Sequence, residues 1–140
     1  LRDAVENQWP KALALDEHTH AGMAAAYTAG AARLPFGMLR GYIGTDLTHV
    51  NPRIKSVRCP FTDEDLTAIP ALNPDVTILH AQKADKKGNV LIEGITGAGR
   101  EAALAADKLI VSVEEIVADF PPMMNAVVLP HWLVCHRPRS

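Results

Sequence analysis

The sequence predicts an α/β fold with a largely parallel sheet flanked by helices. Short apolar segments typical of strands alternate with segments of helical pattern, which is the order expected for this fold class. One of the apolar segments also ends in a cluster of charged residues, and α/β proteins place their ligand sites at such strand ends. The 140 residues are expected to form a single α/β domain, 1–140.

The first quarter of the chain is expected to be mainly helical. A short helix is predicted over 1–9, where Pro10 stops it. An alanine-rich helix is predicted over 13–34, because its apolar residues recur at spacings of three and four. Asp16 is the expected N-cap, and Pro35 is expected to end the helix because it disfavours the α conformation of the residue before it.

The next segments are less regular. The glycine-rich stretch 34–47 is predicted to be an irregular loop. Alternation of apolar and polar residues predicts a strand over 54–61. The following segment, 62–72, begins with a Thr-x-x-Asp capping pattern, which indicates a short helix or a turn.

The second half of the chain carries the strand pattern. A strand over 76–81 leads into a charged cluster and then a sharp reversal at Gly88-Asn89, where an antiparallel element is expected. The remaining predicted elements are a strand over 90–92, a helix over 100–107, a buried strand over 109–113 and a last strand over 126–136.

Composition excludes several classes of protein. The net charge of −2 and the absence of a basic run longer than two residues argue against a nucleic-acid partner. No apolar stretch reaches the length of a membrane span, and the charged first residues do not form the apolar core of a signal peptide. Cys59 and Cys135 are interpreted as buried thiols in a reducing compartment, so a cytoplasmic location is expected.

A glycine-rich stretch permits a dinucleotide-binding interpretation. Gly97-x-Gly99-x-x-Ala102 satisfies a relaxed form of the fingerprint in which glycines let a pyrophosphate approach a helix N-terminus. The expected helix is short, however, and the pattern stands late in the chain. A structural turn between strand and helix is therefore the favoured interpretation.

Other reactive side chains have structural interpretations. Glu93 is expected to be a partly exposed structural acid, because its neighbours offer few donors that could stabilise an oxyanion. His18 and His20 are expected to point to different faces of a helix, and the other histidines fall in separate elements. No metal site is predicted.

Three blocks of the sequence carry a resemblance to a known family. They are THAGMAAAYTAGAARLPFGMLRGYIGTDL (19–47), DVTILHAQKADKKGNV (75–90) and AALAADKLIVSVEEIV (102–117). In order and spacing they resemble the α subunit of the family I CoA-transferases, most closely the glutaconate CoA-transferase type. The resemblance implies a CoA-transferase fold and the C-terminal part of an α subunit that lacks its N-terminal βα units.

The resemblance also implies a reaction. An enzyme of this kind moves CoA between an acyl-CoA thioester and a small carboxylic acid, with coenzyme A as substrate and no bound cofactor or metal. The nucleophilic glutamate is expected in a β-type partner subunit, within a Glu-Asn-Gly setting that is absent here. No catalytic residue is therefore expected in this chain, which is expected to be inactive alone and to act in a hetero-oligomer.

Nine residues at the ends of expected loops are candidates for substrate or CoA binding: Thr19, His20, Arg40, Gly44, Thr45, Asp46, Lys83, Asp85 and Asn89. Asp85 and Asn89 could instead brace the Gly88 turn, and Arg40 could bind a substrate carboxylate or pair with Asp46. Two other functional classes stay open at this point. One is a fragment of a dinucleotide-binding oxidoreductase, and the other is a non-catalytic ligand-binding or assembly module.

Overall fold

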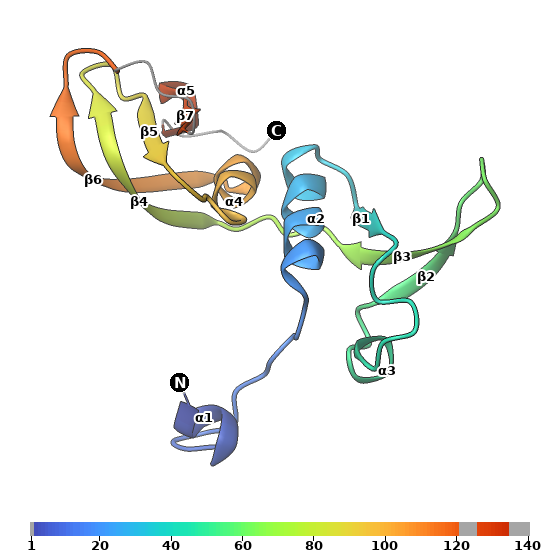
Figure 1. Cartoon of the computed structure of the whole chain (residues 1–140). Helices are drawn as coiled ribbons and strands as arrows, with labels where there is room; N and C mark the ends of the chain where they lie inside the picture. The colour runs from blue at the N-terminus through green and yellow to red at the C-terminus, as the bar shows by residue number, and fades with distance from the viewer. Residues whose placement is uncertain (1, 121–125, 135–140) are drawn as a thin grey trace.

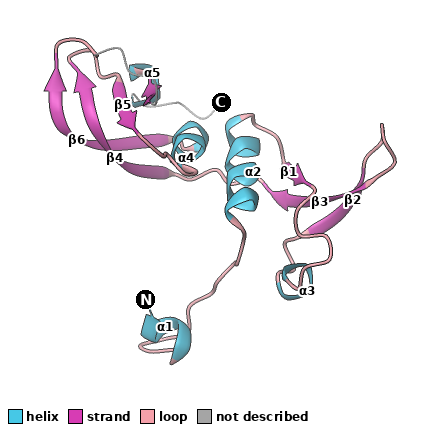
Figure 2. Ribbon diagram, in the orientation of Figure 1, coloured by secondary structure: helices cyan, strands magenta, loops and turns pink. Residues whose placement is uncertain are grey.

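In the computed structural model, which describes residues 2–120 and 126–134, two β-sheets lie on either side of a central helix. Figure 1 shows the four-stranded sheet with its two short helices on one side of helix α2, and the three-stranded sheet on the other. Figure 2 shows the same arrangement by secondary structure, with strands in both halves and helix α2 between them. The α/β class is confirmed, but the strands are divided between two sheets rather than gathered in one.

The chain begins with a helix shorter than expected. Helix α1 spans Arg2–Glu6 and none of its side chains is buried. An exposed ion pair between Arg2 and Glu6 links its two ends at 3.1 Å. An extended segment then leads to helix α2 (Figure 1), so helical structure stops before the predicted end at residue 9.

Helix α2 spans His20–Ala31, and the predicted start at residue 13 is wrong. Residues 11–17 are exposed and irregular, so they lack the buried face on which a helix of this length depends. Thr19 is the N-cap in place of Asp16, and its hydroxyl accepts a hydrogen bond from the backbone N–H of Gly22 at 3.1 Å. The helix ends before Arg33, which has a left-handed φ of 59°.

The three-stranded sheet has the order β1-β3-β2 and is antiparallel throughout. Its strands are β1 (Phe36–Leu39), β2 (Lys55–Arg58) and β3 (Asp65–Pro70), and helix α3 (Leu47–Val50) lies between β1 and β2. Two predictions fail here, since β1 occupies the expected loop 34–47 and β3 occupies the expected helix or turn. Alternating burial explains β3, because Thr67 and Ile69 both face the interior.

The four-stranded sheet has the order β6-β4-β5-β7. Its strands are β4 (Val76–Asp85), β5 (Val90–Glu93), β6 (Lys108–Val117) and β7 (Ala126–Leu129). Strands β4 and β6 are parallel, whereas β5 pairs antiparallel with both β4 and β7. The sheet is therefore mixed, and the expected antiparallel element at Gly88-Asn89 extends over half of it.

Two further helices accompany this sheet. Helix α4 (Gly99–Ala105) connects β5 to β6 as predicted, although it ends two residues early. Helix α5 (His131–Val134) replaces the expected continuation of the last strand. Pro130 follows β7 directly, and proline cannot donate the next ladder hydrogen bond. Residues 135 and 136, the end of that predicted strand, lie outside the described residues.

Each half of the molecule has its own apolar core. Ala81, Val90, Leu109 and Leu129 belong to the core of the four-stranded sheet. The smaller core joins Ala26 of helix α2 to residues of the loops and the three-stranded sheet: Tyr42, Ile54 and Ile69. No helix in the described part of the chain is long and apolar enough to cross a membrane.

Candidate functional site

Tyr42 connects the two parts of the first candidate block. It is 3% exposed although it belongs to a loop, and it has a left-handed φ of 75°. Its phenolic oxygen accepts a hydrogen bond from the backbone N–H of Thr19 at 2.9 Å and lies 3.2 Å from Nδ1 of His18. The start of helix α2 is thereby attached to the glycine-rich loop.

The same tyrosine positions the Gly-Thr-Asp stretch. The backbone N–H and the hydroxyl of Thr45 both donate to the carbonyl oxygen of Tyr42, at 2.9 and 2.8 Å. Gly44 has a φ of 78°, so the turn requires a residue that tolerates the left-handed region. Asp46 precedes helix α3, with its side chain exposed and no side-chain capping bond to that helix. Thr19, Gly44, Thr45 and Asp46 therefore belong to one connected region.

His20 begins helix α2 and is exposed. Its Nε2 lies 3.7 Å from the position that a Cβ atom would take at Gly97. The turn that joins β5 to helix α4 therefore contacts the start of α2. His18, by contrast, precedes the helix, so the prediction that both rings project from one helix is wrong.

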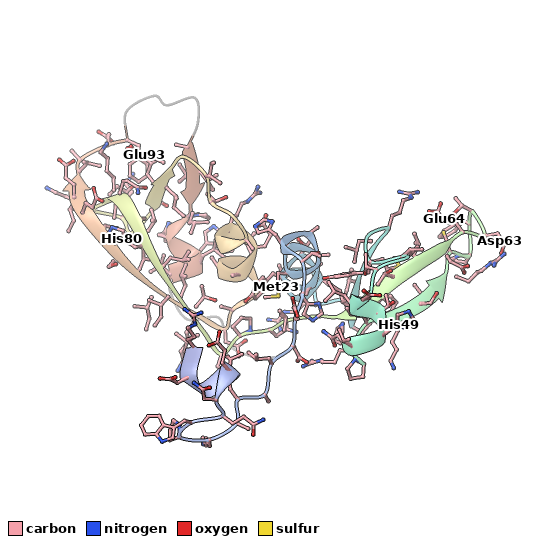
Figure 3. The ribbon with its side chains drawn as sticks, turned by 60° about the horizontal axis from the view of Figure 1, so that its bottom comes forward. Met23, His49, Asp63, Glu64, His80 and Glu93 are labelled. Atoms are coloured by element: carbon pink, nitrogen blue, oxygen red, sulfur yellow. The ribbon has the colours of Figure 1, made fainter. Side chains whose placement is uncertain are left out.

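Arg40 does not pair with Asp46. Its guanidinium donates to both carboxylate oxygens of Glu64, at 2.8 and 3.1 Å. These hydrogen bonds hold the pKa of Glu64 below its ordinary value and raise that of Arg40. The pair lies at the turn that joins β2 to β3, and Figure 3 places Glu64 far from Glu93.

Asp85 and Asn89 brace the turn between β4 and β5. The Asp85 carboxylate accepts hydrogen bonds from the backbone N–H groups of Lys87 and Asn89 and from the Asn89 side chain. The bond from the Asn89 side chain is the main cause of a lowered Asp85 pKa. The oxygen of the Asn89 side chain accepts from the backbone N–H of His131, so the turn is also tied to helix α5. The bracing interpretation is supported by this geometry.

Lys83 is paired with Glu93 across β4 and β5. Lys83 Nζ donates to Glu93 Oε1 at 2.8 Å, and both side chains are about three-quarters buried. The hydrogen bond to Glu93 is the main reason that the pKa of Lys83 is raised. Glu93 has the expected character of a structural acid, since its charge is already matched within the sheet.

The turn at Gly97 and Gly99 has a local structural role. Gly97 has a φ of 55°, and helix α4 begins at Gly99 and is only 7 residues long. Ala103 and Ala105 of that short helix are buried. The geometry agrees with a strand–helix connection, the interpretation favoured from the sequence.

Two further predictions concern cysteines and metals. Cys59 is partly exposed rather than buried, and hydrogen bonds, chiefly from the Thr62 side chain, lower the pKa of its thiol. Cys135 lies outside the described residues. Within 2–120 and 126–134, no three His, Cys, Asp or Glu side chains lie close enough to hold a metal ion.

The nine candidate residues thus fall into three separate groups. One group surrounds Tyr42, a second is the Arg40–Glu64 pair, and the third lies at the turn between β4 and β5. Figure 3 shows Glu93, the ion-pair partner of Lys83, at the opposite end of the molecule from Glu64, with Met23 of helix α2 between them. The described residues therefore do not form a single site from all nine.

Sequence reasoning missed the cavity beside the first group. It has a volume of about 280 Å³ and lies between helix α2, the segment before it and the end of β3. Its lining residues are Asp16, His18, Met23, Ala26, Tyr27, Arg53, Pro70 and Leu72. Arg53 directly precedes the predicted strand over 54–61 and carried no motif, so only its charge could have drawn attention to it.

The comparisons with known proteins identify the family. The model of the family described as "Coenzyme A transferase" matches residues 6–136. The match covers more than half of the chain, which therefore belongs to the coenzyme A transferase family.

A particular relative is closely similar. The chain is 60% identical, over 99% of its length, to the A-type subunit of 3-oxoadipate CoA-transferase from Pseudomonas knackmussii, and it spans 50% of that protein. Among solved structures, a variant of the decarboxylase AibA/AibB gives a TM-score of 0.72 at 29% identity, covering 95% of this chain and 47% of that one. Glutaconate CoA-transferase of Acidaminococcus fermentans gives 0.63 at 29% identity, with 73% and 37% covered. The chain thus spans about half the length of the curated relative that it matches.

Proposed function

We propose that this chain forms part of the α subunit of a CoA-transferase that moves CoA between an acyl-CoA thioester and a carboxylic acid. The observation that carries the proposal is the 60% identity to the A-type subunit of a 3-oxoadipate CoA-transferase over 99% of the chain. The same likeness makes a small dicarboxylic acid such as 3-oxoadipate the expected acceptor. The enzyme is expected to act in the cytoplasm, with coenzyme A as substrate and no resident cofactor.

Two glutamates of this chain are held in ion pairs, which agrees with a nucleophile supplied by a partner subunit. A glutamate that attacks a thioester needs a free carboxylate and donors for the developing oxyanion. Glu93 and Glu64 are instead engaged by Lys83 and Arg40, respectively. These pairings favour a catalytic glutamate in a β-type partner, which would give a hetero-oligomer.

We assign the first candidate group to the active site, which this chain would share with its β-type partner. Thr19, His20, Gly44, Thr45 and Asp46 form a connected, largely exposed surface around Tyr42. Hydroxyl, imidazole and backbone groups of this kind can position an acyl group for attack from the partner. Lys83, Asp85 and Asn89 are assigned to the support of the four-stranded sheet, and Arg40 to the end of the smaller one.

Co-expression tests the proposal. The chain is produced alone and together with the β-type subunit of the Pseudomonas knackmussii enzyme, and each preparation receives an acyl-CoA and 3-oxoadipate. Mass spectrometry then separates the possible reactions. A new CoA ester indicates transfer, free CoA without a new ester indicates hydrolysis, and loss of carbon dioxide indicates decarboxylation.

The expected result is transfer by the mixture and none by the chain alone. A Glu→Ala change at the catalytic glutamate of the β-type subunit provides the matched control, because it removes the nucleophile and leaves the chain unchanged. Turnover by the isolated chain would contradict the assignment of the nucleophile to a partner. Decarboxylation by an assembled mixture would favour the chemistry named for the AibA/AibB structure.

A further inference from the structure

The cavity beside helix α2 is lined by an oppositely charged pair and by an apolar wall. Met23 and Ala26 of α2 and Leu72 after β3 line the wall. Arg53 and Asp16 contribute the charges, and their side chains are 49% and 45% exposed. A recess with one charged end and one apolar side is suited to a short acid whose carbon chain lies against the wall.

Arg53 is held in position by the buried part of the loop. Its backbone N–H donates to Asn51 Oδ1 at 3.0 Å, and Asn51 is 4% exposed. The Asn51 amide in turn donates to the carbonyl oxygen of Glu17 at 2.9 Å and lies 3.3 Å from Nε2 of His18. These contacts connect the base of Arg53 to the segment that forms the opposite side of the cavity.

The guanidinium is able to accept a second carboxylate. Nη1 of Arg53 donates to Oδ2 of Asp16 at 2.8 Å. A guanidinium has five N–H donors, and it binds carboxylates best through two parallel hydrogen bonds. Because the Arg53–Asp16 pair is half exposed, it contributes at most about 1 kcal/mol and can be exchanged.

The cavity volume selects the size of the ligand. At about 280 Å³ it lies near the lower end of small-molecule pockets, which span roughly 300–1,000 Å³. Such a volume accommodates a short carboxylic acid but not the much larger coenzyme. We infer that this cavity binds one carboxylate of a short acid through Arg53, with Asp16 as an internal competitor for the guanidinium; the proposed function makes a dicarboxylic acid the expected ligand.

The inference rests on the proposed function for the identity of the acid, but binding is measured without any reaction. Met23 provides the readout, because its methyl group can be followed by carbon–proton NMR of methyl-labelled methionine. Met38 is the internal control, since it lies on β1 and does not line this cavity. Leucine replacement of each methionine assigns the two signals.

Three probes test the charge and the chain separately. Adipate has the carbon chain of the expected acid and two carboxylates, hexanoate has one, and 1-hexanol has none. We expect adipate to shift the Met23 signal saturably and to leave Met38 unchanged, while 1-hexanol produces no saturable shift. Hexanoate should bind as well, because its single carboxylate can reach Arg53. Saturable binding of 1-hexanol near the affinity of adipate would show that no carboxylate is needed and would overturn the inference.

Two substitutions should change the affinity in opposite directions. Arg53→Gln removes the cation and is expected to weaken adipate binding at least 10-fold. Asp16→Asn removes the competing carboxylate and is expected to strengthen it several-fold. Both side chains are half exposed, and a thermal unfolding curve of each variant verifies that it is folded.

Matched controls come from the distant hairpin and from a neighbouring recess. Arg58 and Asp63 form a similar exposed ion pair at 2.7 Å, so Arg58→Gln and Asp63→Asn should leave adipate affinity unchanged. Lys55 and Arg53 both line a second recess of about 240 Å³. The Lys55→Gln variant therefore shows which of the two recesses binds adipate. If Lys55→Gln weakened adipate binding as much as Arg53→Gln does, the acid would lie in the neighbouring recess.

Two further results would overturn the inference: no saturable shift of Met23 with adipate, or equal effects of Arg53→Gln and Asp16→Asn on adipate affinity. Neither result depends on turnover. If the mixture with the β-type subunit transfers CoA while adipate does not shift Met23, the proposed function stands and the cavity assignment fails. If adipate binds but the mixture does not transfer CoA, the cavity assignment stands and the proposed function fails.

Discussion

At the scale of single residues, the start of helix α2 is held in place by a few close contacts with Tyr42. Its hydroxyl occupies the space beside Gly22 on helix α2, and it also accepts the backbone N–H of Thr19. Buried backbone donors need such partners, because an unsatisfied one costs about 1–3 kcal/mol. The tyrosine therefore both fills the space left by a glycine and completes the cap of the helix.

The contact predicts the effect of Gly22→Ala. A methyl group at Gly22 would overlap the Tyr42 hydroxyl and lie 2.7 Å from its Cζ atom. Helix propensity alone would favour alanine by about 1 kcal/mol. Overpacking costs about 1–3 kcal/mol, so we expect a net decrease in the free energy of unfolding, measured by urea denaturation.

Thr28→Ala is the matched control for this change, because Thr28 is exposed on the same helix. It gains helix propensity without entering an occupied space, so its unfolding midpoint should stay the same or rise slightly. An increase in stability with Gly22→Ala would mean that Tyr42 can move away at little cost, and that it does not fix the start of helix α2.

At the scale of elements, side-chain hydrogen bonds brace the antiparallel part of the larger sheet. The turn between β4 and β5 is closed by Asp85, and Asn89 then connects it to helix α5. Lys83 and Glu93 pair across the same two strands, with 2.8 Å between Nζ and Oε1. Polar side chains at this strand end therefore stabilise the connection between β4, which belongs to the parallel pair, and the antiparallel strand β5.

The turn predicts a dependence of stability on pH. The pKa of Asp85 is lowered by its hydrogen bonds, first of all by that from the Asn89 side chain. A carboxyl group with a lowered pKa in the folded state stabilises the fold above its unfolded pKa of about 3.9. That contribution is lost as the pH falls below about 4 toward the folded pKa.

Asp85→Asn should therefore be less stable than the parent chain at pH 7, and the difference should shrink as the pH falls toward 2. Urea denaturation between pH 7 and pH 2 measures it. Asp119→Asn, at an exposed position, provides the baseline for removing one carboxylate from the chain. A difference that stays constant over this range would show that the Asp85 charge does not stabilise the turn.

At the scale of the whole molecule, one face of the four-stranded sheet is uncovered in the described chain. Ile78 and Ile110 are register partners on β4 and β6, and they are 73% and 56% exposed. Ile116 on β6 is 69% exposed, while residues on the other face such as Ala81 and Leu109 are buried. Exposed apolar surface of this kind usually marks an interaction site.

We therefore expect the chain to associate, either with a β-type partner or with itself. Light scattering at micromolar concentration should give a mass above the 15.1 kDa of one chain. Ile110→Lys should reduce association because it places a charge beside Ile78 on the uncovered face. Ile95→Lys is the control, because Ile95 is fully exposed in the segment between β5 and helix α4.

A sharp monomer of 15.1 kDa that binds no apolar dye would contradict this expectation. From the sequence alone, the expected contact surfaces are the Ala24 to Ala32 face of the alanine-rich helix and a strand containing Trp132. Trp132 belongs to helix α5 rather than to a strand, and it is 50% exposed. The β4–β6 face is the stronger candidate, because its apolar residues are adjacent across two strands.

The sequence by itself determined the family and the elements with local signals. Apolar runs marked β4, β5 and β6, and the Gly88-Asn89 pair marked the reversal between two of them. The family motifs could be recognised in the sequence because each is a contiguous stretch of the chain. These features depend on neighbouring residues, so a linear reading contains the information that specifies them.

Tertiary contacts decided the rest. The Thr62 capping pattern was overridden because Thr67 and Ile69 bury alternate positions of β3 between its neighbours. Helix α2 starts at His20 rather than at residue 13 because the phenol of Tyr42, 23 positions beyond Thr19, completes its cap. The cavity at Arg53 likewise joins segments far apart in the chain. Burial and hydrogen bonding between distant residues outweigh local propensities of about 1 kcal/mol, and no local pattern encodes which distant residue will be the partner.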